Sequence, residues 1–120
     1  MHIYSFEKLD VWKESIKLAI KTYKITDLLP SEEKFGLTSQ MSRCSVSVSS
    51  NIAEGTSRLT QKDKAHFMTI EYSFAIELLN QAIISKELQF ISNKNYLDLR
   101  QDIESITNKI NALRKHFLNS

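Results

Sequence analysis

The chain has 120 residues, of which 42% are apolar and 25% are charged, with sixteen basic and fourteen acidic side chains. This is the length of one domain and the composition of a folded protein, which excludes a second domain and a wholly disordered chain. Two glycines and one proline are too few for an all-β protein, which needs a turn residue about every 8–12 positions. A net charge of +2 is far from that of a histone-like protein and does not by itself indicate nucleic-acid binding.

Compartment and membrane association follow from a few simple features. Cys44 is the only cysteine, which excludes an internal disulfide and a cysteine metal cluster and fits a reducing compartment. The segment Met1–Asp10 is charged and has no apolar centre, unlike a signal peptide. No apolar run approaches the length of about 18 residues that a membrane span needs. We therefore expect a cytoplasmic protein with no membrane partner.

A first helix is predicted over about residues 9–29. Two neighbouring apolar stripes, one beginning at Val11 and one at Trp12, cover about half of its circumference, as in a helix packed against two neighbours. Pro30 is expected to end it, because the residue before a proline disfavours the helical backbone. Four cations, here called the lysine stripe, fall within an arc of about 80° on the other side: Lys13, Lys17, Lys21 and Lys24.

The second helix is predicted over about 37–54, with Gly55 as a candidate C-cap. Serine and valine alternate over Ser45–Ser49, as they would in a strand. However, apolar residues at helical spacing extend over sixteen residues, and a lone strand would have no partner, so helix is favoured. The small serines allow close approach to neighbouring helices. Cys44 lies on the apolar stripe and is interpreted as a core residue rather than a nucleophile.

Two longer helices are predicted over about 61–88 and 92–118, with Thr60 and Ser92 as N-caps. Basic residues without any acid occupy 105–120, where they complement the negative end of the helix dipole. The last helix also carries a heptad seam, formed by Tyr96, Leu99, Ile103, Ile106, Ile110, Leu113 and Phe117.

Four helices joined by short connections predict an all-α, antiparallel up-down-up-down four-helix bundle in a single domain, 1–120. The apolar stripes are wide enough that closing the bundle is expected to leave apolar surface uncovered. Self-association would bury that surplus, which predicts a homo-oligomer.

The sequence offers no reaction chemistry, and we predict no catalytic residue, no metal and no cofactor. Di-iron bundles need Glu-x-x-His pairs, and none of the three histidines follows a glutamate at that spacing. A phosphate-binding loop and a His-Glu-x-x-His motif are also absent. Glu54 and Glu77 are interpreted as buried carboxylates on adjacent helices, satisfied by Arg43 or by backbone groups.

Charge placement is the remaining signal. The lysine stripe forms one line of cations, and Arg58, Lys62 and Lys64 cluster at the turn before the third helix, opposed by Asp63 alone. Such patches track phosphates by releasing counterions, although an exposed helix face gives the same pattern. Both interpretations stay open.

Several motifs together resemble a known family, the four-helix bundle proteins encoded in intervening sequences of bacterial 23S rRNA genes. The resemblance covers about residues 6–117 and is strongest in the second helix. Its motifs are Phe6–Trp12, Gly36–Met41 with Arg43, Ser50–Gly55 with Arg58, and Glu77, Gln81 and Lys86–Leu88.

The resemblance implies a homopentameric ring without catalytic activity. The family is similar to the accessory proteins of diversity-generating retroelements, basic pentamers that bind nucleic acid and a reverse transcriptase. RNA or DNA is therefore an expected partner, as is a reverse transcriptase if a retroelement lies beside the gene. The resemblance also adds Arg43 to the candidate nucleic-acid contacts and identifies a structural signature: Asn51, Glu54, Gly55, Glu77 and Gln81.

Two functional hypotheses follow. In the first, the oligomer contacts RNA or DNA through its basic patches. In the second, it is a protein-interaction scaffold with no nucleic-acid role, and signature residues such as Asn51 and Glu54 organise subunits or a partner helix. These polar residues act as anchors within or between protomers in one interpretation and contact a ligand in the other.

Overall fold

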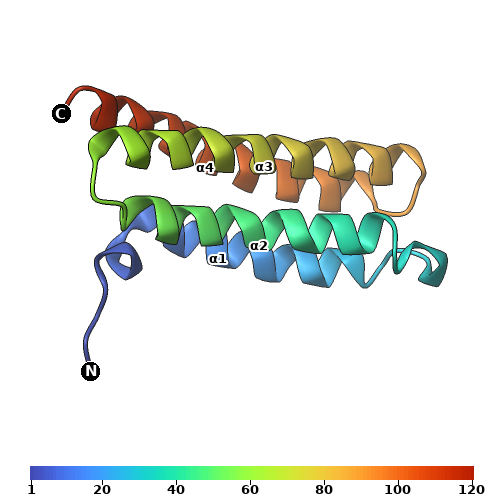
Figure 1. Ribbon diagram of the computed structural model, residues 1–120. Coiled ribbons are helices and arrows are strands. Elements are labelled where there is room, and N and C mark those ends of the chain that lie inside the picture. Colours follow the sequence, from blue (N-terminus) through green and yellow to red (C-terminus); the bar gives the residue numbers. More distant parts are fainter.

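The computed structural model describes all 120 residues and contains four long helices (Figure 1). They are α1 (Asp10–Thr26), α2 (Leu37–Thr56), α3 (Gln61–Glu87) and α4 (Asn93–Leu118). Short 3₁₀ turns precede α1 and α2, at Ser5–Lys8 and Ser31–Glu33. The prediction of an all-α protein is confirmed, including a helix through Ser45–Ser49.

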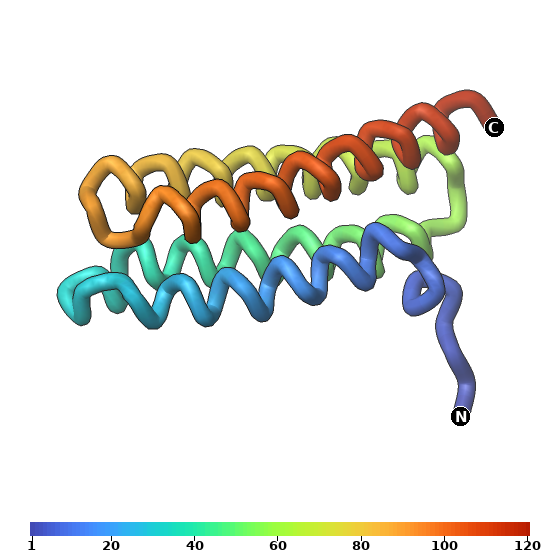
Figure 2. The backbone as a smooth tube through the Cα atoms, turned by 180° about the vertical axis from the view of Figure 1, so that it is seen from behind, coloured from blue at the N-terminus to red at the C-terminus, as the bar shows by residue number.

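The helices run up and down in two layers, with α1 beside α2 and α3 beside α4 (Figures 1 and 2). The α1–α2 and α3–α4 connections lie at one end of the bundle, and the α2–α3 turn lies at the other with both chain termini. This is the predicted up-and-down arrangement of a four-helix bundle. None of the four helices combines the length and apolarity needed to cross a membrane.

Helix ends agree with the prediction except at two places. The predicted N-caps are confirmed, since the Thr60 hydroxyl accepts from the amide of Asp63 and the Ser92 hydroxyl from that of Asn95. The first helix ends at Thr26 rather than at Leu29, because the amides of Leu28 and Leu29 bond three residues back, to the carbonyls of Ile25 and Thr26, and form a tighter turn.

Gly55 is not a C-cap, contrary to the prediction. The second helix continues through it to Thr56, and Gly55 itself is buried. A methyl group on Gly55 would overlap the Cβ of Phe67 on α3 and would lie 3.0 Å from the Cε of Met68. The glycine is therefore explained by the close approach of α2 to α3 rather than by an unusual backbone angle.

The core is one continuous apolar cluster fed by all four helices. Six of the seven predicted seam residues of α4 are buried and Leu113 is half-buried, which confirms the heptad interpretation. In α1 only the stripe that begins at Val11 is buried. Tyr23, on the stripe that begins at Trp12, is 52% exposed, so the prediction that both stripes are packed against neighbouring helices is wrong at this position. The bundle covers a narrower arc of α1 than the apolar pattern suggests.

Small hydroxyl side chains fill part of the interior. Ser45 and Ser49 of α2 are buried, and their hydroxyls donate to the backbone carbonyls of Ser42 and Val46, at 2.9 Å in both cases. Thr22 of α1 is also buried and bonds to its own helix. Because each hydroxyl is satisfied locally, these positions give close helix packing without needing a partner across the interface.

Candidate nucleic-acid interface

The lysine stripe borders a polar seam between α1 and α4. Lys21 Nζ lies 3.0 Å from Asp98 Oδ1 and 2.6 Å from Asp102 Oδ2. Burial alone would lower the pKa of Lys21, but the hydrogen bonds and charges of Asp102 and Asp98 outweigh it and raise that pKa. Lys21 is therefore protonated, and its positive charge is already balanced by two carboxylates within the chain. This leaves it little capacity to bind a phosphate.

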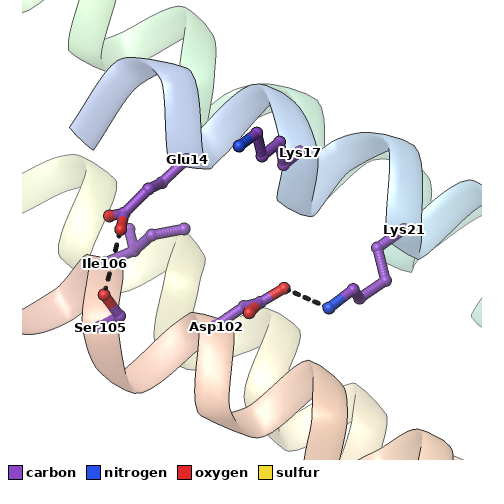
Figure 3. A pocket seen from close by; sticks show the side chains of 6 residues that line it. All are labelled: Glu14, Lys17, Lys21, Asp102, Ser105 and Ile106. Carbon is purple, nitrogen blue, oxygen red and sulfur yellow. Dashed lines mark hydrogen bonds and ion pairs between the residues drawn. The ribbon is translucent and has the colours of Figure 1, made fainter. Parts of the chain in front are cut away.

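A second ion pair crosses the same seam about two helical turns away. Glu14 Oε1 accepts from Lys109 Nζ at 2.8 Å and from the hydroxyl of Ser105 at 3.4 Å. A hollow of about 320 Å³ lies between the two bridges and is also lined by Lys17. Figure 3 shows Glu14 and Lys21 of α1 reaching toward Ser105 and Asp102 of α4. The remaining members of the stripe, Lys13, Lys17 and Lys24, have no ion-pair partner. Three members of the stripe, Lys17, Lys21 and Lys24, thus line hollows that Asp98 or Asp102 of α4 also lines.

The second predicted cluster lies at the end of the bundle that carries the α2–α3 turn. Arg58 is 3.8 Å from Asp63 and stacks on the Phe67 ring at 5.5 Å, while Lys62 is exposed and unpaired. Lys64 lies over the ring of Phe117 on α4, at 5.6 Å from its centroid. Cation–aromatic contacts fix the position of a charged group without neutralising it.

Antiparallel packing adds two cations of α4 to this cluster. The contact between Lys64 and Phe117 brings the C-terminal turns of α4 against the first turns of α3, and with them Arg114 and Lys115. The sequence analysis assigned these two residues to the helix dipole and did not place them beside the α2–α3 turn. The absence of acidic residues from 105–120 was the signal that could have indicated a basic surface. We call the combined group the basic end; it consists of Arg58, Lys62, Lys64, Arg114 and Lys115.

The signature residues divide between packing and exposed positions. Gly55 and Gln81 are buried, and Gln81 Nε2 lies 3.5 Å from the sulfur of Cys44. Asn51 is half-buried and donates to the carbonyl of Ser47 in its own helix at 2.7 Å. Glu54 is exposed and has no ion-pair or hydrogen-bond partner in the chain.

The interpretation of Glu54 and Glu77 as buried carboxylates is wrong, because both are exposed and Arg43 pairs with neither. The buried carboxyl is instead Glu71 of α3, which is 0% exposed and has no hydrogen-bond partner for either oxygen. Burial raises its pKa to about 9, so Glu71 is protonated at neutral pH. Nothing in the spacing of acidic residues identified Glu71. A single glutamate in a helix has no feature in the sequence that distinguishes a buried carboxyl from an exposed one.

Metal-binding and nucleophilic groups are not gathered anywhere in the bundle. No three His, Cys, Asp or Glu side chains come together as potential metal ligands. Cys44 is buried, as predicted, and burial raises the pKa of its thiol despite the hydrogen bond from Gln81. A protonated, inaccessible thiol is a poor nucleophile.

These features place the chain in the class of all-α four-helix proteins. Its distinctive surface is the basic end. A family profile described as 23S rRNA-intervening sequence protein matches residues 7–112. The chain therefore belongs to the 23S rRNA-intervening sequence protein family, which confirms the resemblance drawn from its motifs.

Among solved structures, a protein with the same fold illustrates the similarity. It is a protein of unknown function from the S23 ribosomal protein family of Bacteroides thetaiotaomicron, with a TM-score of 0.81 and 21% sequence identity. The match covers 88% of this chain and 95% of the other, which shows the fold alone. Comparison with curated proteins gives no match.

Proposed function

We propose that this chain is the subunit of a non-enzymatic homo-oligomer that contacts RNA or DNA through its basic end. The observation that carries the proposal is the local excess of positive charge. Residues 57–70 and 105–120 together contain six lysines and arginines and a single acid, Asp63. Lys109 is occupied by Glu14, which leaves the five cations of the basic end. Each phosphate that such a cation neutralises releases counterions and adds affinity.

The lysine stripe has a secondary role in this proposal. The stripe has four lysines, but one of them, Lys21, is held by Asp98 and Asp102. Acids that flank a cationic line reduce the potential felt by a phosphate chain. Arg43 is exposed on α2 and has no partner, so it is a further single contact rather than part of the basic end.

Self-association is part of the proposal, and exposed apolar side chains on the outer sides of α2 and α3 support it. Val46 is 41% exposed, Ile76 41% and Ile84 40%, and Leu88 follows at the end of α3. Burial of such side chains against a second copy contributes favourably at about 25 cal/mol per Å². The family resemblance implies a ring of five, which would have a mass of about 70 kDa, five times 13.9 kDa. Repetition around a ring would raise a weak protomer affinity by avidity.

The test is a comparison of two triple variants that lose the same charge. In the first, Arg58, Lys62 and Lys64 become glutamine; in the second, Lys13, Lys17 and Lys24 do. Filter binding of a structured RNA is measured between 50 and 200 mM salt. We expect the unaltered protein to bind with a steep salt dependence, and the first variant to lose far more affinity than the second. Absence of salt-sensitive binding by the unaltered protein would contradict the proposal.

The second candidate function is a protein-interaction scaffold with no nucleic-acid role. The exposed, unpartnered Arg43 lies three residues before the exposed Val46 on α2 and favours it, because arginine is enriched at protein interfaces. Under this alternative the oligomer and any captured partner would survive nuclease treatment unchanged. A reverse transcriptase is the partner to test first if a retroelement lies beside the gene.

A further inference from the structure

A groove on the outer side of the bundle, between α3 and α4, has the composition of an oxyanion site. Its volume is about 320 Å³, at the lower end of the range of about 300–1,000 Å³ typical of ligand pockets. Four of the five lining side chains are neutral, and the fifth, Arg114, is a cation. No carboxylate lines the groove, whose residues are Thr69, Tyr72, Ser73, Asn111 and Arg114.

Arg114 is the centre of this groove and lacks a partner. Its Nε is buried without a hydrogen-bond acceptor, and its guanidinium forms no ion pair in the chain. An arginine cannot lose its charge in a protein, and a buried N–H without an acceptor is destabilising. The planar guanidinium also presents parallel N–H groups that match two oxygens of a phosphate. The structure thus contains an arginine that lacks the acceptor its geometry requires.

The neutral side chains around Arg114 are able to complete the coordination of an anion. Tyr72 and Asn111 are half-buried, and neither side chain makes a hydrogen bond within the chain. Thr69 and Ser73 donate to backbone carbonyls of their own helix at 3.3 Å, longer than the usual O–H···O distance of about 2.7–2.8 Å. These weak bonds can be exchanged for stronger ones to a charged acceptor.

No carboxylate on the neighbouring turns of α3 and α4 opposes an anion in the groove, because each is buried, paired with a cation or outside the groove. Glu71, next to Tyr72, points into the core and is fully buried. Glu104 of α4 is paired with Arg100 at 2.9 Å. Glu77 is four residues beyond Ser73 and does not line the groove. An anion in the groove would therefore meet one cation and several donors without direct opposition from an acid.

The groove also continues into the basic end. Lys62 and His66 precede Thr69 and Ser73 on the same side of α3, at helical spacings of four, three and four residues, and both are exposed. Lys115 follows Arg114 on α4. A chain of phosphates that has one group in the groove would therefore meet further cations in one direction, which an isolated phosphate ion would not use.

We propose that the α3–α4 groove around Arg114 seats one phosphate group, and that this group belongs to the backbone of a nucleic acid. The inference rests on the proposed function for the source of the phosphate, but the groove and its oxyanion chemistry stand independently. Arg114 would hold two phosphate oxygens through the N–H edge of its guanidinium, with Tyr72 and Asn111 donating to them.

Three variants test the seat, with fluorescence anisotropy of a labelled single-stranded RNA as the readout. Arg114→Gln is expected to weaken binding about tenfold at 100 mM salt, and Arg114→Lys about threefold, because lysine keeps the charge but lacks the planar fork. Lys115→Gln loses the same charge at the adjacent exposed position and is expected to lose only about twofold. Equal losses for Arg114→Gln and Lys115→Gln, or unaltered binding by Arg114→Lys, would overturn the inference.

A second arm identifies the source of the phosphate and separates this inference from the proposed function. Side-chain ¹⁵N signals of Arg114 and Asn111 are followed while RNA or inorganic phosphate is added. We expect shifts of both signals with RNA at micromolar concentration and only weak shifts with phosphate at millimolar concentration. Saturation by phosphate without RNA binding would retain the oxyanion seat but refute the nucleic-acid source and the proposed function. RNA binding that leaves both signals unmoved would refute the seat and leave the proposed function intact.

Discussion

The α2–α3 interface and the α1–α4 seam connect neighbouring helices in opposite ways. At the first, Gly55 removes a side chain so that α2 can pack directly on Phe67 and Met68. At the second, Lys21 and Glu14 reach across to α4 through ion pairs that border open hollows. Apolar contacts of the first kind lose attraction as soon as the helices separate. Ion pairs of the second kind are exposed to water and ions, and each contributes little.

This difference separates the parts of the chain that determine the fold from those that are available for function. The tight interface leaves no room for a ligand, and its constraints act on single residues such as Gly55. The polar seam and the outer α3–α4 groove leave charged and hydrogen-bonding groups accessible to solvent. We expect large, salt-independent effects of substitution at the first and small, salt-dependent effects at the seam.

The largest effect is expected at Glu71 of α3, which is fully buried. Its folded-state pKa of about 9 lies above the ordinary value of 4.5, so the unfolded chain ionises first as the pH rises. The contribution of Glu71 to the free energy of unfolding is therefore greatest below about pH 4.5, where the carboxyl is neutral in both states. It decreases progressively as the pH rises to about 9. At about 1.4 kcal/mol per pH unit, the free energy of unfolding falls by about 4 kcal/mol between pH 5 and 8.

Glu71→Met removes this dependence and is expected to raise stability at pH 8 by several kcal/mol, since a neutral side chain of similar length replaces an unpartnered carboxyl. Urea unfolding at a series of pH values measures both effects. Glu32→Met, at an exposed position, is the control and should follow the unaltered protein. Parallel pH profiles for Glu71→Met and the unaltered protein would show that this carboxyl does not titrate abnormally.

A smaller effect is expected from Gly55→Ala. The added methyl group overlaps Phe67 Cβ, so the α2–α3 spacing must increase. Overpacking of this kind costs about 1–3 kcal/mol, partly offset by the better helix propensity of alanine of about 1 kcal/mol. Urea unfolding should show a net loss that persists in 1 M NaCl. Ser50→Ala, on the exposed side of the same helix, should change stability little; a Gly55→Ala variant as stable as Ser50→Ala would refute the close-packing explanation.

The smallest effect is expected in the seam. Lys21→Gln removes both ion pairs, yet Asp98 and Asp102 remain accessible to water, so the loss should be below about 1 kcal/mol. Salt screens these pairs, and the difference from the unaltered protein should disappear in 1 M NaCl. Lys13→Gln, which removes an exposed and unpaired lysine of the same helix, is the matched control. A loss of several kcal/mol at both salt concentrations would mean that the seam is as constrained as the α2–α3 interface.

Much of the fold was predictable, because apolar periodicity is a local property of the sequence. The heptad of α4 and the caps Thr60 and Ser92 each depend on residues within a few positions of one another. The role of Gly55 was not predictable in this way, since it depends on Phe67, twelve residues later and on another helix. The early end of α1 at Thr26 depends on a turn geometry that the proline alone does not specify.

The candidate site was only partly predictable for the same reason. Arg58, Lys62 and Lys64 are close in sequence and were recognised together. Arg114 and Lys115 join them only through the antiparallel packing of α3 and α4, which is a tertiary feature. Conversely, Lys21 looked like a free cation until the structure placed two aspartates of α4 beside it.

The most direct test of the central claim is the mass of the protein in solution, measured by sedimentation with and without a structured RNA. The account predicts an oligomer, near 70 kDa if five chains of 13.9 kDa assemble, that gains the mass of the RNA at 50 mM salt and releases it at 200 mM. A single chain of 13.9 kDa whose sedimentation does not change when RNA is added would contradict both the assembly and the nucleic-acid contact.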